Sequence, residues 1–155
     1  MQTSFTDKQL LDKDNKSSES ILRKCVHCGM CNATCPTFCV NGEELEGPRG
    51  RIYLIKDMLE NKKPANKKVV KHIDSCLSCY SCMTTCPSGV NYMHLIDHGR
   101  NYVEETYKRP FFDRLFRNVL SFVLPRPKVF LTLAYLSKLI KPFSFLLPTF
   151  LKNSL

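Results

Sequence analysis

No hydrophobic run in this sequence reaches the ~20 residues that a helix needs to cross a bilayer. The longest uncharged stretch of the C-terminal part, PFSFLLPTFL, has half that length and contains two prolines. The N-terminal segment MQTSFTDKQLLDKDNKSSES is polar, with neither an apolar signal region nor a twin arginine, so it does not mark the chain for export. These absences predict a cytoplasmic protein without a membrane span.

The sequence also lacks the motifs that hold nucleotides and organic substrates. It has no G-x-G-x-x-G, no P-loop and no arrangement that suggests a catalytic triad. No segment alternates apolar and polar residues in the manner of a half-buried strand. We therefore expect an all-α protein with no catalytic residues and no substrate site of its own.

Acidic residues are scarce in the last third of the chain. Residues 108–155 hold 9 Lys and Arg but a single acid, Asp113, whereas residues 1–107 hold 14 Lys and Arg and 13 Asp and Glu. The excess positive charge therefore belongs to the tail, and it predicts a partner or a surface for that segment. Nucleic acid is not the expected partner, because the basic residues are scattered among Leu and Phe and no recognition motif accompanies them.

Cysteine is abundant, and eight of the nine cysteines stand in two runs with the same spacing. The runs are CVHCGMCNATCP at residues 25–36 and CLSCYSCMTTCP at residues 76–87, an internal repeat at an offset of 51 residues. Disulfides suit small exported proteins, and zinc sites usually take paired C-x-x-C units. Two C-x2-C-x2-C-x3-C-P runs instead favour two [4Fe–4S] clusters.

In such proteins the first three cysteines of a run bind one cluster, and the fourth, before the proline, binds the other. The predicted ligands are Cys25, Cys28, Cys31 and Cys86 for the first cluster, and Cys76, Cys79, Cys82 and Cys35 for the second. Four residues separate Cys31 from Cys35, at most about 14 Å of extended chain, so we expect the clusters to lie close together. Since about ninety helical residues supply little core, the clusters are also expected to stabilise the fold.

Periodicity and prolines divide the chain into three parts. We expect a mobile N-terminal arm over residues 1–17, a helical two-cluster domain over residues 18–109, and a basic, proline-broken, amphipathic helical tail over residues 110–155. Within the domain, helices are predicted over residues 19–25, 51–61, 67–76 and 91–108, and a loop over residues 40–50. The predicted inward faces are Ile52, Ile55, Met58 and Leu59; Val69, Val70 and Ile73; and Tyr92, Leu95 or Ile96, Gly99, Tyr102 and Val103.

Four residues in or near the cysteine runs are not expected to bind a cluster. Gly29 suits a positive φ in the first loop, but Tyr80 holds the equivalent place in the second, so that conformation is not expected to be essential. His27 is expected to be a bystander beside a complete ligand set. The odd cysteine, Cys39, is expected to be a small buried hydrophobic residue.

Outside the runs, two arginines leave two interpretations open. Arg49 and Arg51, in the segment GPRGR, either tune a cluster or contact a partner, or are solvated charges of a loop. The remaining histidines, His72, His94 and His98, are expected to be ordinary helix residues.

Four ordered segments carry a family resemblance: ILRKCVHCGMCNATCPTF, GEELEGPRGRIYLIKDMLE, CLSCYSCMTTCPSGVNYMHLIDHGR and RPKVF. With them the chain resembles, from about residue 20 to about residue 142, the N-terminal part of the glycolate oxidase (glycolate dehydrogenase) iron–sulfur subunit. The GPRGRIYLIK and TCPSGV segments make the resemblance specific. The electron-transfer subunits of heterodisulfide reductase and of anaerobic glycerol-3-phosphate dehydrogenase share the cysteine runs.

The resemblance implies an α-helical ferredoxin domain, in complex with flavin-bearing subunits that oxidise glycolate to glyoxylate. Electrons would pass from the flavin through two clusters toward a membrane quinone. Family members continue into a C-terminal region with two cysteine-rich CCG repeats, which this sequence stops before, and Cys39 stands outside the family pattern.

Two questions stay open at this point. The tail is expected to contact the CCG region or a separate subunit that carries it, with the anionic inner face of the cytoplasmic membrane as the alternative. The alternative function is a free-standing two-cluster ferredoxin, or a subunit of one of the related oxidoreductases.

Overall fold

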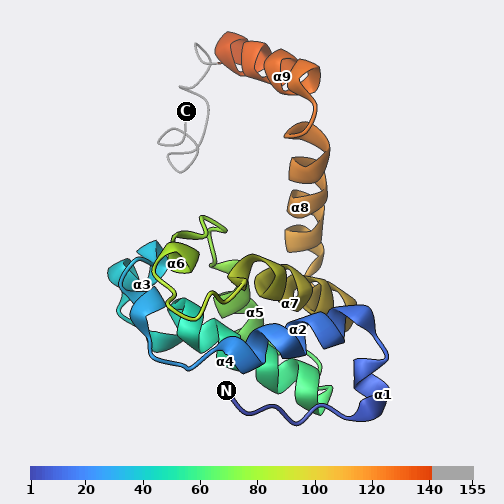
Figure 1. Cartoon of the computed structure of the whole chain (residues 1–155). Coiled ribbons are helices and arrows are strands. Elements are labelled where there is room, and N and C mark those ends of the chain that lie inside the picture. The colour runs from blue at the N-terminus through green and yellow to red at the C-terminus, as the bar shows by residue number, and fades with distance from the viewer. Residues whose placement is uncertain (141–155) are drawn as a thin grey trace. The chain divides into compact units, whose positions relative to one another are not determined.

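The computed structural model of the chain describes residues 1–140, and the chain divides into two compact units, Met1–Lys108 and Arg109–Leu155. Every regular element among the described residues is a helix, and no strand occurs there (Figure 1). The predicted all-α fold is confirmed for this part of the chain.

The first unit contains short helices around its cysteines and longer ones in its core. The α-helices are α1 (Asp7–Leu10), α2 (Lys13–Lys24), α3 (Pro36–Asn41), α4 (Pro48–Asn61), α5 (Lys67–Asp74), α6 (Ser81–Thr84) and α7 (Tyr92–Thr106). Two 3-10 turns, η1 (Met30–Asn32) and η2 (Glu44–Glu46), flank α3. Figure 1 shows α3 and α6 at the same end of the unit, so both cysteine runs gather there.

The core of this unit lies where α2, α4, α5 and α7 pack against one another. Its fully buried members include Leu22 of α2, Ile55 of α4 and Leu95 of α7. The predicted inward faces are largely confirmed: Ile52, Ile55, Met58, Leu59, Val70, Ile73, Tyr92, Leu95, Ile96, Gly99 and Val103 are all buried. Val69 and Tyr102 are only partly buried against this core.

The N-terminal segment differs from the mobile arm that its composition predicts. Asp12 caps α2, so this helix begins at Lys13, six residues before the predicted start at residue 19, and Ser18 is fully buried within it. Gln9 is also buried, and its side-chain amide donates a hydrogen bond of 2.9 Å to the carbonyl of Leu59 near the end of α4. Because the last carbonyls of a helix lack partners within it, a polar side chain can dock there without an apolar signal in the sequence.

Residues 40–50 also contain more structure than the predicted loop. They include the end of α3, the turn η2 and the first residues of α4, which starts at Pro48 with Gly47 as its N-cap. Proline is well suited to the first turn of a helix, because its missing N–H would have no partner there. Gly50 lies so close to the backbone of Glu44 and Leu45 that a Cβ atom would collide with the Glu44 carbonyl. Gly50 therefore lets α4 pack directly on η2.

The second unit contains α8 (Phe111–Val123) and α9 (Pro127–Ile140), as the proline pattern predicts. At 100° per residue, the apolar residues of α8 all fall on one half of the helix and the polar residues on the other. Large side chains of the apolar half are exposed, with Phe111, Phe112 and Phe116 at 72%, 81% and 64%. Residues 141–155, including the predicted breaks at Pro142 and Pro148, lie outside the described part.

Among the described residues, no single helix is long and apolar enough to cross a membrane. Two segments taken together are long and apolar enough to do so, but they are bent by 110° at the break between them: Phe111–Val123 and Pro127–Leu136.

Candidate iron–sulfur centre

The two cysteine loops repeat the same backbone conformation. In the first loop, His27 and Gly29 have φ angles of 60° and 86°, and 51 residues later Ser78 and Tyr80 have φ angles of 51° and 56°. Each pair flanks the second cysteine of its run and wraps the chain around it. The expectation that Tyr80 shows this conformation to be dispensable is therefore wrong, since Tyr80 adopts it at a typical cost of about 1–2 kcal/mol.

Equivalent residues of the two runs also touch each other. Thr34 and Thr85, which precede the fourth cysteine of each run, have their hydroxyl oxygens 3.2 Å apart, and the Thr34 hydroxyl lies 3.2 Å from the carbonyl of Ser81. Contact between residues at the same repeat position is what two-fold pairing of similar units produces. The sequence repeat is therefore also a repeat in space.

A first cavity is lined by the first three cysteines of one run and the last of the other. Its thiols are those of Cys25, Cys28, Cys31 and Cys86, and Cys82 also borders it. Its empty volume is about 450 Å³, counted with space open to solvent. The structure thus brings together the four residues predicted for the first cluster.

A second cavity shows the reciprocal arrangement. Its thiols are those of Cys35, Cys76, Cys79 and Cys82, the set predicted for the second cluster. Cys82, Pro48 and Tyr92 line both cavities, so the two are neighbours.

Each cavity has one cysteine at the surface. Cys28 and Cys79 are exposed, and the residues two positions before them, Val26 and Leu77, are exposed apolar side chains at 68% and 66%. These pairs are again separated by 51 residues. A redox partner could therefore approach each cavity over an apolar patch.

The donor set fits an iron–sulfur cluster, which is held by cysteine thiolates. All nine cysteines are free thiols. Burial, reinforced by the neighbouring cysteines, raises the pKa of Cys31 to about 11 and that of Cys82 to about 12. These thiols are protonated at neutral pH in the absence of metal, and binding iron would release their protons.

Helix α4 sends one arginine to each cavity. Arg49 lines the first cavity, is one-third exposed and pairs with Glu44 at 2.5 Å. Its Nη1 would lie only 2.5 Å from a Cβ atom at Gly29, so this glycine also leaves room for Arg49. Arg51 lines the second cavity and is 1% exposed. Of the two interpretations left open, the solvated loop charge is wrong for Arg51.

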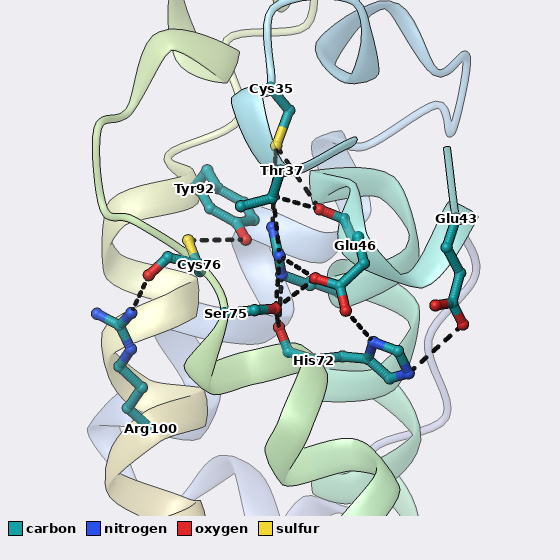
Figure 2. Close-up of polar contacts among 10 residues, drawn as sticks. Cys35, Thr37, Glu43, Glu46, His72, Ser75, Cys76, Tyr92 and Arg100 are labelled. Atoms are coloured by element: carbon teal, nitrogen blue, oxygen red, sulfur yellow. Dashed lines mark hydrogen bonds and ion pairs between the residues drawn. The ribbon is translucent and has the colours of Figure 1, made fainter. Parts of the chain in front are cut away.

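Arg51 is held in a buried polar network (Figure 2). Its Nη2 donates to a Glu46 carboxylate oxygen at 3.0 Å, and its Nε donates to the carbonyl of His72 at 2.7 Å. Glu46 also accepts hydrogen bonds from Ser75 and pairs with His72 Nδ1 at 2.8 Å. Burial alone would raise the pKa of Glu46, but the bonds from Ser75 and His72 and the charge of Arg51 hold it below its usual value. His72 is thus a structural partner of a buried carboxylate and not an ordinary helix residue.

The same network reaches a predicted cluster ligand. Arg51 Nη1 lies 3.9 Å from Cys35 Sγ, and its Nη2 donates to the Thr37 hydroxyl at 3.0 Å. That hydroxyl lies 3.2 Å from the same sulfur and 2.7 Å from the Glu46 carbonyl, to which it donates. The Glu46 carbonyl is itself 3.7 Å from Cys35 Sγ.

Tyr92 makes the corresponding contact with another predicted ligand at the second cavity. Its hydroxyl donates to Cys76 Sγ at 3.7 Å, as Figure 2 shows. The ring is 3% exposed, and burial raises the pKa of Tyr92 well above its usual value, so the hydroxyl keeps its proton. The sequence predicted Tyr92 only as an apolar face residue of α7, because nothing local links it to a cysteine sixteen residues away.

Cys39, outside the runs, lies apart from the cavities, and His27, within the first run, lies at the edge of one. Cys39 is exposed on α3, with its Sγ 3.4 Å from the Ala33 carbonyl, so the expected buried position is wrong. His27 borders the first cavity and packs edge-on against Tyr53, with ring centroids 5.4 Å apart. Its Nδ1 is buried without a hydrogen-bond partner among the described residues.

Comparison with known proteins bears directly on this arrangement. The 4Fe-4S dicluster domain family matches residues 21–90, the span that contains both cysteine runs. The chain's cofactor is accordingly of the [4Fe–4S] type, as the cysteine spacing predicts.

Three relatives show where such a domain occurs. The chain is 49% identical, over 92% of its length and 35% of the relative, to the glycolate oxidase iron–sulfur subunit of Escherichia coli (strain K12). It is 32% identical, over 72% of its length and 26% of the relative, to a probable glycolate oxidase iron–sulfur subunit of Bacillus subtilis (strain 168). A mitochondrial succinate dehydrogenase iron–sulfur subunit of Candida glabrata is 27% identical over half of this chain and 33% of that protein. No solved structure matches.

These matches confirm the resemblance to glycolate oxidase iron–sulfur subunits. The chain spans about a third or less of the length of those two relatives. The part shared with the first relative covers 143 residues and so extends beyond the dicluster domain at residues 21–90. The activity of the longer proteins does not follow from it directly.

Proposed function

We propose that this chain is an electron-transfer component of a flavin-dependent complex that oxidises glycolate to glyoxylate. Its 4Fe-4S dicluster domain would bind two clusters, one in each cysteine-lined cavity. The first would be held by Cys25, Cys28, Cys31 and Cys86, and the second by Cys76, Cys79, Cys82 and Cys35. When bound, a [4Fe–4S] cluster accepts and releases one electron without making or breaking a bond to substrate.

The observation that carries this proposal is the pair of adjoining cavities, each lined by the four cysteines predicted for one cluster and each with one exposed cysteine. The buried cysteines hold the metal away from water, while Cys28 and Cys79 bring each site to the protein surface. Pro48, at the start of α4, lines both cavities, so the positive end of that helix lies beside two anionic sites. Two adjoining sites with separate exits suit transfer between two different partners.

The proposed partners follow from the relatives and from the tail. The 49% identity to a glycolate oxidase iron–sulfur subunit supports flavin-bearing subunits of that enzyme as the electron donor. The exposed apolar half of α8 supports a protein that covers it, such as a separate CCG-repeat subunit. The basic charge of the tail supports the anionic inner face of the cytoplasmic membrane as the alternative location.

The decisive experiment tests whether glycolate can reduce this chain. The reconstituted protein would be mixed anaerobically with the flavin-bearing subunits, and its visible absorption and electron paramagnetic resonance (EPR) signal followed after glycolate is added. We expect reduction only when those subunits and glycolate are both present. A Cys25→Ala, Cys76→Ala double variant, which lacks a ligand at each site, is the control and should show no such signal.

A different outcome would favour the alternative function. If unrelated ferredoxin reductases reduce the protein readily while glycolate with the flavin-bearing subunits does not, the chain is a free-standing two-cluster ferredoxin. Binding of stoichiometric zinc without sulfide would exclude both functions.

A further inference from the structure

The polar surroundings of the two cavities are unequal, although their cysteines follow the same repeat. Side-chain donors point at sulfurs of the second cavity, among them the Tyr92 hydroxyl at Cys76 and Arg51 Nη1 at Cys35. Among the described residues, the donors to sulfurs of the first cavity are backbone groups, such as the N–H of Val90 to Cys86 at 3.4 Å. The repeat is therefore symmetric in its ligands and asymmetric in the groups around them.

The residues at equivalent repeat positions explain this difference. Moving 51 positions back from Tyr92 leads to Asn41, at the end of α3, and moving 51 positions on from Arg51 leads to Tyr102 in the middle of α7. Neither residue lines a cysteine cavity. Tyr92 and Arg51 thus have no counterparts at the equivalent repeat positions. Arg49, which lines the first cavity, pairs with Glu44.

Reduction adds a negative charge to a cluster and its ligand sulfurs. Hydrogen-bond donors that point at those sulfurs stabilise the reduced form and raise the reduction potential. The effect is larger where water is excluded, because the local dielectric constant is low. Tyr92 and Arg51 are 3% and 1% exposed, so both act from buried positions.

Two other influences on the reduction potential, solvent exposure and nearby charge, differ less between the two cavities. Solvent exposure raises the potential of a cluster, but each cavity has one exposed cysteine, Cys28 or Cys79. The charge of Arg51 is balanced by the Glu46 carboxylate at 3.0 Å. What remains is the orientation of the ion pair, in which the guanidinium has an N–H group close to Cys35.

We propose that Tyr92 and Arg51 raise the reduction potential of the cluster at the second cavity above that of the cluster at the first. The proposal rests on the two-cluster function proposed above. A protein that carries a single electron would then hold it mainly at the second cavity, the one lined by Cys35, Cys76, Cys79 and Cys82. Tyr92 and Arg51 are in this sense positioning residues, which act through the ligands and do not themselves bind iron.

The test is a potentiometric titration of the full chain with both clusters, followed by EPR, for the unaltered protein and for Tyr92→Phe. This change removes one hydroxyl and keeps the buried ring. We expect two potentials, of which Tyr92→Phe lowers only the higher. At a fixed ambient potential, the ratio of reduced to oxidised cluster at that site should fall three- to tenfold, roughly 30–60 mV for a one-electron couple.

Two further variants make the result specific. Tyr102→Phe removes a hydroxyl from the same helix but away from both cysteine cavities, and it should shift neither potential. Arg51→Lys keeps the charge but shortens the reach of the donor, and it should lower the same potential as Tyr92→Phe. If Tyr92→Phe or Arg51→Lys loses the fold, its iron content will reveal the loss, and the other of these two variants still decides.

The outcomes distinguish this proposal from the function on which it rests. Fewer than about eight irons per chain in the unaltered protein would show that two clusters do not bind, before any potential is measured. With about eight irons present, two equal potentials overturn the proposal, as does a Tyr92→Phe variant that lowers the lower potential or leaves both unchanged.

Discussion

At the scale of single residues, cysteines that are close in the sequence differ in the groups that surround each sulfur. Cys35 lies beside Arg51 and Thr37 in a buried network, whereas Cys39, one turn later in α3, is exposed. Two cysteines four residues apart thus have opposite environments. The fourth cysteine of the first run faces the second cavity, which is why its loss should be felt at the other run.

That reciprocity can be tested by combining ligand substitutions. Cys35→Ala should lower the iron content from about eight to about four per chain, because one cubane is lost. If Cys35 shares a cluster with Cys76, the double variant Cys35→Ala, Cys76→Ala should lose no more iron than either single variant. Cys35→Ala combined with Cys25→Ala should instead lose almost all of it.

The control for this series is Cys39→Ala, which should keep about eight irons because its thiol is exposed and borders neither cavity. Iron and sulfide would be counted after anaerobic reconstitution. Nearly complete loss in the Cys35, Cys76 pair, with only half lost in the Cys35, Cys25 pair, would reverse the assignment.

At the scale of elements, α4 connects the cavities to the core. Its first turn borders both cavities, its middle packs against α7, and its end receives Gln9 from the N-terminal segment. Close approach at Gly50 and at Gly99 makes these contacts possible, since a Cβ atom at Gly99 would come within 2.8 Å of Ile55 Cγ1. Glycine is needed here for space and not for helix propensity, which favours alanine.

Gly50→Ala should therefore destabilise the protein although it replaces glycine within a helix. Propensity alone would stabilise α4 by up to about 1 kcal/mol, but the new methyl group meets the Glu44 carbonyl, and backbone cannot move aside as a side chain can. We expect a net loss of about 1–3 kcal/mol in the free energy of unfolding. Thermal unfolding of the reconstituted protein would measure it.

Gly42→Ala provides the contrasting control. Gly42 has a φ of 67° but no heavy atom within 4 Å of an added Cβ, so this change isolates the cost of the left-handed backbone. That cost is about 1–2 kcal/mol, without displacement of η2 from α4. If Gly50→Ala instead raises the unfolding temperature, the close approach between α4 and η2 is not tight in solution.

At the scale of the whole molecule, the chain joins a unit with a buried core to a tail whose described side chains are largely exposed. The tail holds most of the excess positive charge, and α8 separates its apolar and polar residues cleanly. We expect a partner surface to bury the apolar half of α8. Salt weakens an interface held by charge, whereas an interface held by apolar contacts does not weaken in this way.

Two matched variants separate these possibilities. Phe112→Gln with Phe116→Gln reduces the apolar face without changing charge, and Arg114→Gln with Arg117→Gln reduces the charge while keeping that face. We expect the phenylalanine pair to weaken co-purification with the flavin-bearing subunits at both low and high salt, and the arginine pair to leave it nearly intact. Both should keep about eight irons, because the tail is not part of the cysteine cavities.

Flotation with anionic and with neutral vesicles completes this comparison. Binding to anionic vesicles that disappears at high salt and in the arginine pair would assign the tail to a membrane surface. A form of the chain that ends at Arg109 and still co-purifies with the flavin-bearing subunits would contradict a docking role for the tail.

The sequence by itself determined the features that depend on spacing along the chain. The repeated cysteine runs predicted the cofactor and the two sets of four cysteines that line the cavities, because a short loop can wrap a cluster only with such intervals. Apolar periodicity likewise predicted the inner faces of α4 and α7, with Ile55 and Leu95 among the buried residues. Burial of this kind follows from the 3.6-residue period of a helix and needs no knowledge of partners.

Only the tertiary structure decided which polar residues are buried and what they touch. Arg51 meets His72 twenty-one residues away, Tyr92 meets Cys76 sixteen residues away, and Gln9 meets Leu59 fifty residues away. No local pattern encodes such pairs, because a polar side chain is buried only when distant elements supply hydrogen-bond partners. Cys39 lies exposed on α3, with its Sγ beside the Ala33 carbonyl, where hydrophobicity alone predicted burial.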